Sequence, residues 1–123
     1  RIEGSTSGKV RVVGSKSFGH LTTKDYRQFL EVSPEERLTL RIEPDADVVA
    51  ADRALQKALS QDQYISMFDL ICGGDESCPL FTPGGALISF DGGHLSPEGA
   101  ALVGREMIHD PQFSFLSSFA SKP

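Results

Sequence analysis

Residues 86–104 of this 123-residue chain are ALISFDGGHLSPEGAALVG, and they combine three local signals in direct succession. The apolar segment 86–90 has the pattern of a short strand or an extended segment. The Ser-Pro pair at 96–97 is typical of the first positions of a helix. Between them lie Asp91 and His94, separated by two glycines. The stretch therefore predicts a strand, a tight turn that carries an acid and an imidazole, and a helix.

Asp91 and His94 have the residue types of a catalytic acid–base pair. In layered α/β folds, ligands bind beyond the carboxyl ends of the strands, which is where this pair falls. A histidine that serves a serine as general base exposes one ring nitrogen, while a carboxylate holds the other. Gly92 and Gly93 allow the chain to fold back, so that the Asp91 carboxylate can reach Nδ1 of the ring.

The spacing of the pair is a weak signal when it is taken alone. Nine Asp and three His in this chain give roughly 0.2 Asp-x-x-His matches by chance. The alternative interpretation is a turn in which Asp91 accepts hydrogen bonds from the backbone. His94 is then only a partly exposed residue at the start of a helix.

The segments upstream of this stretch alternate between strand and helix patterns. The sequence predicts strands at 9–13 and 64–71, and helices at 23–30, from Ser33 onward and at 46–60. Strands that alternate with helices favour a layered α/β domain, here with a small, mainly parallel sheet.

Two of the predicted helices have apolar faces that we expect to be buried. In the helix at 46–60 these residues are Val48, Ala51, Leu55 and Leu59, opposite a polar face of Asp52, Arg53 and Gln56. In the helix that begins after Ser96 they are Ala100, Val103, Met107 and Ile108.

The composition is that of one soluble globular domain, with 39% hydrophobic and 24% charged residues. The net charge of −5 argues against nucleic acid or an anionic membrane surface as the main partner. The chain begins with Arg, so we expect a processed product or part of a longer protein. Residues 1–8 are polar and predict a flexible tail or linker, which leaves 9–123 as the folded part.

The two cysteines, Cys72 and Cys78, lie in the loop-like sequence CGGDESC. Two glycines between them favour a local disulfide, which would imply an oxidising compartment. Two unrelated reduced thiols are the alternative. A zinc site requires four closely spaced ligands, and none of the three histidines is near in sequence. We therefore expect no metal and no cofactor.

The wider pattern resembles the last block of the SGNH hydrolase superfamily. It is most similar to the SGNH domains attached to integral-membrane acyltransferases that O-acetylate polysaccharides. Those domains have a cysteine pair, a short strand and then Asp-x-x-His-Leu-Ser-x-x-Gly-Ala. The corresponding residues here are Cys72, Cys78, Asp91, His94, Leu95, Ser96, Gly99 and Ala100. The resemblance extends over about 8–108.

The resemblance implies that His94 is a general base and that Asp91 orients it. The family's nucleophile lies in a Gly-Asp-Ser block, and its oxyanion hole uses Gly and Asn. This chain has no Asn, and its only Gly-Asp, at 74–75, is followed by Glu76. We therefore expect the nucleophile in a preceding segment that this chain lacks. Ser15 and Ser17 follow a predicted strand, but they lack a Gly-x-Ser-x-Gly elbow, so we expect them to make loop hydrogen bonds.

The resemblance further implies a partial three-layer α/β/α fold of the flavodoxin-like, SGNH type. By it, the chain is the C-terminal half of an esterase or O-acetyltransferase domain that acts on carbohydrate ester groups. The implied partners are a preceding segment of the same protein, a carbohydrate ester and a membrane acyltransferase domain, but no nucleic acid. The implied location is the periplasm or the extracytoplasmic face of the inner membrane, in a membrane-anchored protein.

Two other hypotheses belong to different classes. One is a degenerate, non-catalytic module that binds a glycan or a partner domain, and the other is a plain structural fragment. Upstream sequence discriminates between the enzyme and the binding module, because only the enzyme requires a Gly-Asp-Ser block and an Asn block.

Overall fold

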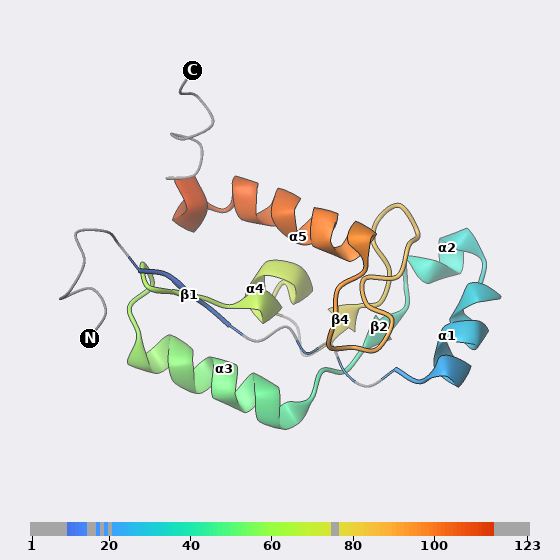
Figure 1. Ribbon diagram of the computed structural model, residues 1–123, viewed down its shortest axis with the longest axis horizontal. Coiled ribbons are helices and arrows are strands. Elements are labelled where there is room, and N and C mark those ends of the chain that lie inside the picture. The colour runs from blue at the N-terminus through green and yellow to red at the C-terminus, as the bar shows by residue number, and fades with distance from the viewer. Residues whose placement is uncertain (1–9, 15–16, 18, 20, 75–76, 115–123) are drawn as a thin grey trace, which may run out of the picture.

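The computed structural model describes residues 10–14, 17, 19, 21–74 and 77–114 (Figure 1). The helices are α1 (Thr23–Leu30), α2 (Pro34–Arg37), α3 (Ala46–Ala58), α4 (Met67–Cys72) and α5 (Pro97–His109), followed by a 3-10 turn η2 (Pro111–Phe113). The strands are β1 (Val12–Val13), β2 (Arg41–Ile42), β3 (Tyr64–Ile65) and β4 (Cys78–Pro79). Helices and small strand pairs together give the predicted α/β class. The tail predicted at 1–8 lies outside the described residues.

The strands form two short pairs within the described part of the chain. β1 pairs with β3 in parallel, with Val12 opposite Tyr64. β2 pairs with β4 antiparallel, with Ile42 opposite Cys78. The segment 86–90 is extended and makes only isolated antiparallel bridges. One parallel and one antiparallel pair thus stand where the sequence predicted a single, mainly parallel sheet.

The predicted strand at 64–71 is correct only for its first two residues. Ser66 ends the strand, because its hydroxyl accepts the backbone N–H of Asp69 at 3.1 Å and so caps a helix. The following residues form α4, which ends at Gly73 in the left-handed conformation (φ 71°). A short apolar run is compatible with a buried strand or a buried helix, and here the serine cap decides for the helix.

Helix α3 begins where predicted, but it fully buries a side chain of the face that was predicted to be polar. Its one buried residue is Asp52, which is 1% exposed, whereas Leu55 is 41% exposed. The reason is that the Asp52 carboxylate accepts hydrogen bonds from the side chains of Tyr64 and Ser66. Val48, on the predicted apolar face, also packs against the main hydrophobic core, so parts of both faces are packed.

Helix α5 is also rotated relative to the prediction. It buries Gly99, Leu102 and Val103, while Ala100 and Ile108 are exposed. Only Val103 belongs to both the predicted and the observed buried face. The rotation follows from the start of the helix, where Gly99 contacts the backbone of the preceding segment.

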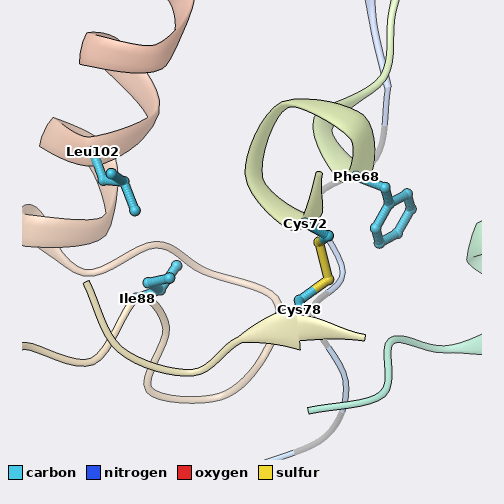
Figure 2. Packing of buried hydrophobic residues seen from close by; sticks show 5 residues of the cluster. All are labelled: Phe68, Cys72, Cys78, Ile88 and Leu102. Atoms are coloured by element: carbon cyan, nitrogen blue, oxygen red, sulfur yellow. A yellow bond between two sulfur atoms is a disulfide. The ribbon is translucent and has the colours of Figure 1, made fainter. Parts of the chain in front are cut away.

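The disulfide between Cys72 and Cys78 is present and lies in the main core (Figure 2). It joins the last residue of α4 to the first residue of β4. Phe68, Ile88 and Leu102 pack in the same cluster. The disulfide therefore connects a helix and a strand through the core, rather than closing a surface loop alone. None of the helices in the described residues is long and apolar enough to span a bilayer.

Candidate active site

The start of α5 is fixed against the segment 86–90 by Ser96. This buried hydroxyl accepts the backbone N–H of Gly99 at 2.9 Å and donates to the carbonyl of Leu87 at 2.5 Å. A Cβ at position 99 would lie 2.1 Å from the carbonyl oxygen of Ile88, so only glycine allows this approach. The Ser-Pro-x-Gly sequence thus sets where the helix begins and how closely it packs.

Ser89 closes the turn that precedes α5. Its buried hydroxyl donates to the carbonyl of His94 at 2.6 Å and accepts the N–H of Gly92 at 2.7 Å. Gly92 has a φ of 86°, in the left-handed region that favours glycine. The role of Ser89 was not predicted from sequence, although a lone hydroxyl in the apolar segment ALISF is a signal for a side chain that bonds to the backbone.

The Asp91 carboxylate makes both kinds of contact that the sequence left open. Oδ1 accepts the backbone N–H groups of Gly93 at 2.8 Å and His94 at 2.7 Å. Oδ2 lies 2.7 Å from Nδ1 of His94, which is the predicted contact. With the carboxylate ionised, Nδ1 is the donor in this bond, so Nε2 carries the free lone pair. The turn therefore presents a ring whose free nitrogen can accept a proton.

Both side chains of the pair are open to solvent, with His94 87% and Asp91 52% exposed. The backbone N–H of His94, its ring and the N–H of Gly93 lower the pKa of the Asp91 carboxyl well below its usual range. Hydrogen bonding to the charged form is the cause, because burial acts in the opposite direction. Asp91 is thus an anion at every pH at which an imidazole can act as a base.

The Asp91 carboxyl is expected to titrate below the ordinary value of 3.8 in the folded chain. The folded state then binds fewer protons than the unfolded state, so the contribution of this group to stability is present above pH 3.8. That contribution is lost as the pH falls through the folded pKa. Carboxyl-detected NMR gives the midpoint. In His94→Ala the midpoint is expected to rise only part of the way to 3.8, because the backbone N–H groups of residues 93 and 94 still bond to the carboxylate. A wild-type midpoint at or above 3.8 would contradict these hydrogen bonds.

The ring of His94 makes no other hydrogen bond within the part of the chain that the structure describes. No serine among those residues lies at hydrogen-bond distance from Nε2, and Ser17 is among them. Ser15 lies outside the described residues. Over the described ranges, no cluster of three or more His, Cys, Asp or Glu side chains is arranged to hold a metal ion.

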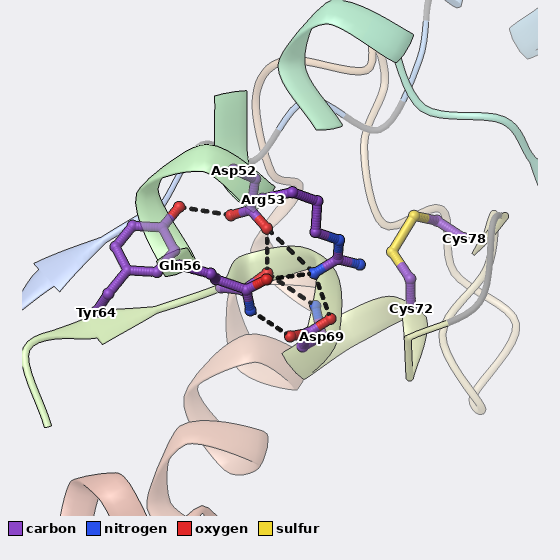
Figure 3. Close-up of polar contacts among 8 residues, drawn as sticks. Asp52, Arg53, Gln56, Tyr64, Asp69, Cys72 and Cys78 are labelled. Carbon is purple, nitrogen blue, oxygen red and sulfur yellow. Dashed lines mark hydrogen bonds and ion pairs between the residues drawn. A yellow bond between two sulfur atoms is a disulfide. The ribbon is translucent and has the colours of Figure 1, made fainter. Parts of the chain in front are cut away.

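A second polar cluster surrounds Asp52 (Figure 3). The Tyr64 hydroxyl donates to Oδ1 at 2.5 Å and the Ser66 hydroxyl donates to Oδ2 at 2.7 Å. Burial, and then the bond to Asp52, raises the pKa of Tyr64 well above its usual range. A Cβ at Gly14 would lie 2.2 Å from the Tyr64 hydroxyl, so the end of β1 packs directly on this cluster.

Arg53 extends the cluster toward the surface. It lies 2.8 Å from the Asp69 carboxylate and 3.4 Å from that of Asp52. Gln56 bonds to both Arg53 and Asp69. Ser66 has no imidazole among these partners, and its hydroxyl proton is committed to Asp52, so nothing here activates it as a nucleophile. The cluster joins α3, β3 and α4 and is structural.

A family model described as "SGNH domain (fused to AT3 domains)" matches residues 12–109. The matched range contains the cysteine pair, the Asp91–His94 turn and all of α5. Neither the curated proteins nor the solved structures gave a match.

Proposed function

Because the chain belongs to the family of SGNH domains fused to AT3 domains, we propose that it supplies the Asp-x-x-His part of a Ser-His-Asp triad. The domain acts as an esterase or O-acetyltransferase on carbohydrate ester groups. His94 is the general base and Asp91 holds it. The observation that carries the proposal is the 2.7 Å contact between Asp91 Oδ2 and His94 Nδ1, which leaves Nε2 open.

The proposed reaction is acyl transfer through a serine ester. Nε2 of His94 removes the proton from a serine hydroxyl while that oxygen attacks the ester carbonyl carbon. Asp91 stabilises the imidazolium that forms, and the imidazolium then protonates the departing sugar oxygen, which leaves as a hydroxyl. In the second half, His94 deprotonates water or an acceptor hydroxyl, whose oxygen attacks the acyl-serine. The imidazolium then returns the proton to the departing serine oxygen. Water gives hydrolysis, and a sugar hydroxyl gives O-acetyl transfer.

The serine and the oxyanion hole come, in this proposal, from a preceding segment of the same domain. The chain carries no Gly-Asp-Ser block and no Asn, and the proposal assigns residues 9–123 to the C-terminal part of that domain. That segment also completes the three-layer α/β/α arrangement beside β1, whose Val12 and Val13 are exposed. In this proposal the preceding segment also covers His94, which excludes water from the dyad and strengthens its interactions.

The partners and the location follow from the family and from the disulfide. A membrane acyltransferase domain is the proposed partner and anchors the protein. The Cys72–Cys78 disulfide supports an oxidising compartment, and hence the periplasm or the extracytoplasmic face of the inner membrane. Carbohydrate esters on that side of the membrane are the proposed substrates, and the net charge of −5 argues against nucleic acid.

A non-catalytic module that binds a glycan or a partner domain is the second candidate. It is favoured by one observation: within the described residues, no nucleophile contacts Nε2 of His94. A longer protein without a Gly-Asp-Ser block would support this candidate over the enzyme.

The isolated 123-residue chain is expected to hydrolyse p-nitrophenyl acetate no faster than its His94→Ala variant. Acyl transfer requires a nucleophile within reach of the base and donors aimed at the oxyanion, and losing one such donor alone costs about 100- to 1,000-fold. The longer protein that includes the preceding segment is expected to be active. If the isolated chain is as active as the longer protein and loses that activity in His94→Ala, then the nucleophile lies in this chain. An inactive longer protein would favour the binding module.

A further inference from the structure

We infer that a groove beside Asp91 binds one sugar ring of the substrate, an inference that rests on the proposed function. The groove has a volume of about 440 Å³, and its lining residues are Leu21, Thr23, Tyr26, Phe90 and Asp91. Small-molecule sites in proteins start at roughly 300 Å³, so this groove is large enough for one monosaccharide unit.

The wall of the groove is aromatic. Phe90 is 49% exposed, although it directly follows three buried residues of the extended segment. Its ring meets that of Tyr26 edge-to-face, with centroids 5.5 Å apart and planes at 80°. This contact restricts the Phe90 ring, which reduces the side-chain entropy lost when a ligand packs on it. A pyranose has an apolar face of C–H groups that matches such a surface.

The rim of the groove is polar, which distinguishes a sugar from an acyl chain. The cap of α1 is made by Thr22 and Asp25, and the Thr23 hydroxyl takes no part in it. Among the described residues this hydroxyl makes no hydrogen bond and is available to a ligand. Asp91 Oδ2 accepts only the His94 ring there and has a further lone pair. Sugar hydroxyls donate to a carboxylate and accept from a threonine, whereas an alkyl chain leaves both unused.

The charge of the groove favours a neutral sugar. Among the described residues that line the groove, Asp91 is the only charged one, and its lowered pKa keeps it anionic. A uronic acid ring places a second carboxylate beside it, which costs free energy through like-charge repulsion. We therefore assign the groove to neutral hexoses, and a glucoside is expected to bind more tightly than the matching glucuronide.

The groove adjoins the candidate dyad of Asp91 and His94, and the backbone connects the two. The N–H of Leu21 approaches the carbonyl of Asp91 at 3.4 Å, which links the groove wall before α1 to the turn that carries His94. Phe90 and Asp91 are consecutive, so the aromatic wall and the orienting carboxylate belong to the same turn. A sugar ring in the groove thus lies against the residue that holds the catalytic ring.

Saturation-transfer NMR on the 123-residue chain tests the inference without any turnover. The probes are methyl β-D-glucopyranoside, methyl α-D-mannopyranoside, methyl β-D-galactopyranoside and methyl β-D-glucuronide. At least one neutral probe is expected to bind, with a Kd of about 1–10 mM. Phe90→Ala is expected to weaken its binding about tenfold. Ile108→Ala, which removes another apolar side chain that is 66% exposed, is the matched control and is expected to leave the Kd unchanged.

The results of this binding experiment can be distinguished from those of the activity test of the proposed function. Binding of no neutral probe, or equal binding in wild type and Phe90→Ala, overturns the inference. So does displacement of the sugar by sodium butyrate at equal concentration, because that result assigns the groove to the acyl group. An inactive longer protein with intact sugar binding contradicts the enzyme alone, and leaves the groove as a glycan site.

Discussion

His94→Ala is expected to lower kcat for p-nitrophenyl acetate by at least about 1,000-fold in a longer protein that includes the proposed nucleophile segment. The alanine removes Nε2, the atom that takes the proton of the nucleophile in the proposed mechanism. Asp91→Asn is expected to cost a comparable factor. An amide in place of Oδ2 can donate to Nδ1, which favours the tautomer whose proton sits on Nε2 and cannot act as a base. Stopped assays with the purified variants measure both effects.

Asp110→Asn provides the matched control for that experiment. Asp110 also caps backbone N–H groups, through its 2.8 Å bond to Gln112, but it lies at the opposite end of α5. We expect this variant to retain its activity within about twofold. Circular dichroism identifies any variant that has simply unfolded. A folded His94→Ala protein with wild-type kcat would remove His94 from the mechanism.

Asp52→Ala is expected to lower the free energy of unfolding by about 3 kcal/mol. The variant leaves the Tyr64 and Ser66 hydroxyls buried without their acceptor, and it opens a cavity beneath Gly14. Small domains have only about 5–15 kcal/mol in total, so this is a large fraction of the stability. Urea denaturation followed by circular dichroism measures the loss.

Tyr64→Phe is the graded control for the Asp52 experiment. It removes one donor but leaves Asp52 bonded to Ser66, so we expect a loss of about 1 kcal/mol. If Asp52→Ala does not fold at all, the Tyr64→Phe value still tests the network. A change below about 0.3 kcal/mol in Tyr64→Phe would show that the buried bond contributes nothing.

The features that sequence predicted well are those decided within a few neighbouring residues. The Ser96 cap, the start of α3 and the helix at 23–30 depend on local hydrogen bonds, and the structure has them where expected. The Asp91–His94 contact is of the same kind, because the two residues are three positions apart and the turn between them is short. The cysteine pair is local as well.

The features that sequence missed depend on contacts between distant segments. Periodicity assigned Asp52 to the solvent, because a carboxylate is assumed to be exposed unless its partner is known. Its partners, Tyr64 and Ser66, come from another element. The groove beside Asp91 likewise combines Phe90 with Tyr26 of α1, and nothing in either local sequence indicates that their rings meet. The catalytic role itself stays a prediction.

The close approach of Gly99 to the Ile88 carbonyl has a consequence for motion. A solvent-exposed imidazole on an ordinary loop samples many orientations on the nanosecond timescale. Here the backbone on both sides of His94 is tied down, by Ser89 before it and by the Ser96–Gly99 helix start after it. These hydrogen bonds restrict the backbone of the turn relative to α5. For the proposed mechanism this means that little backbone reorganisation remains when a substrate binds, because folding has already ordered the backbone of His94.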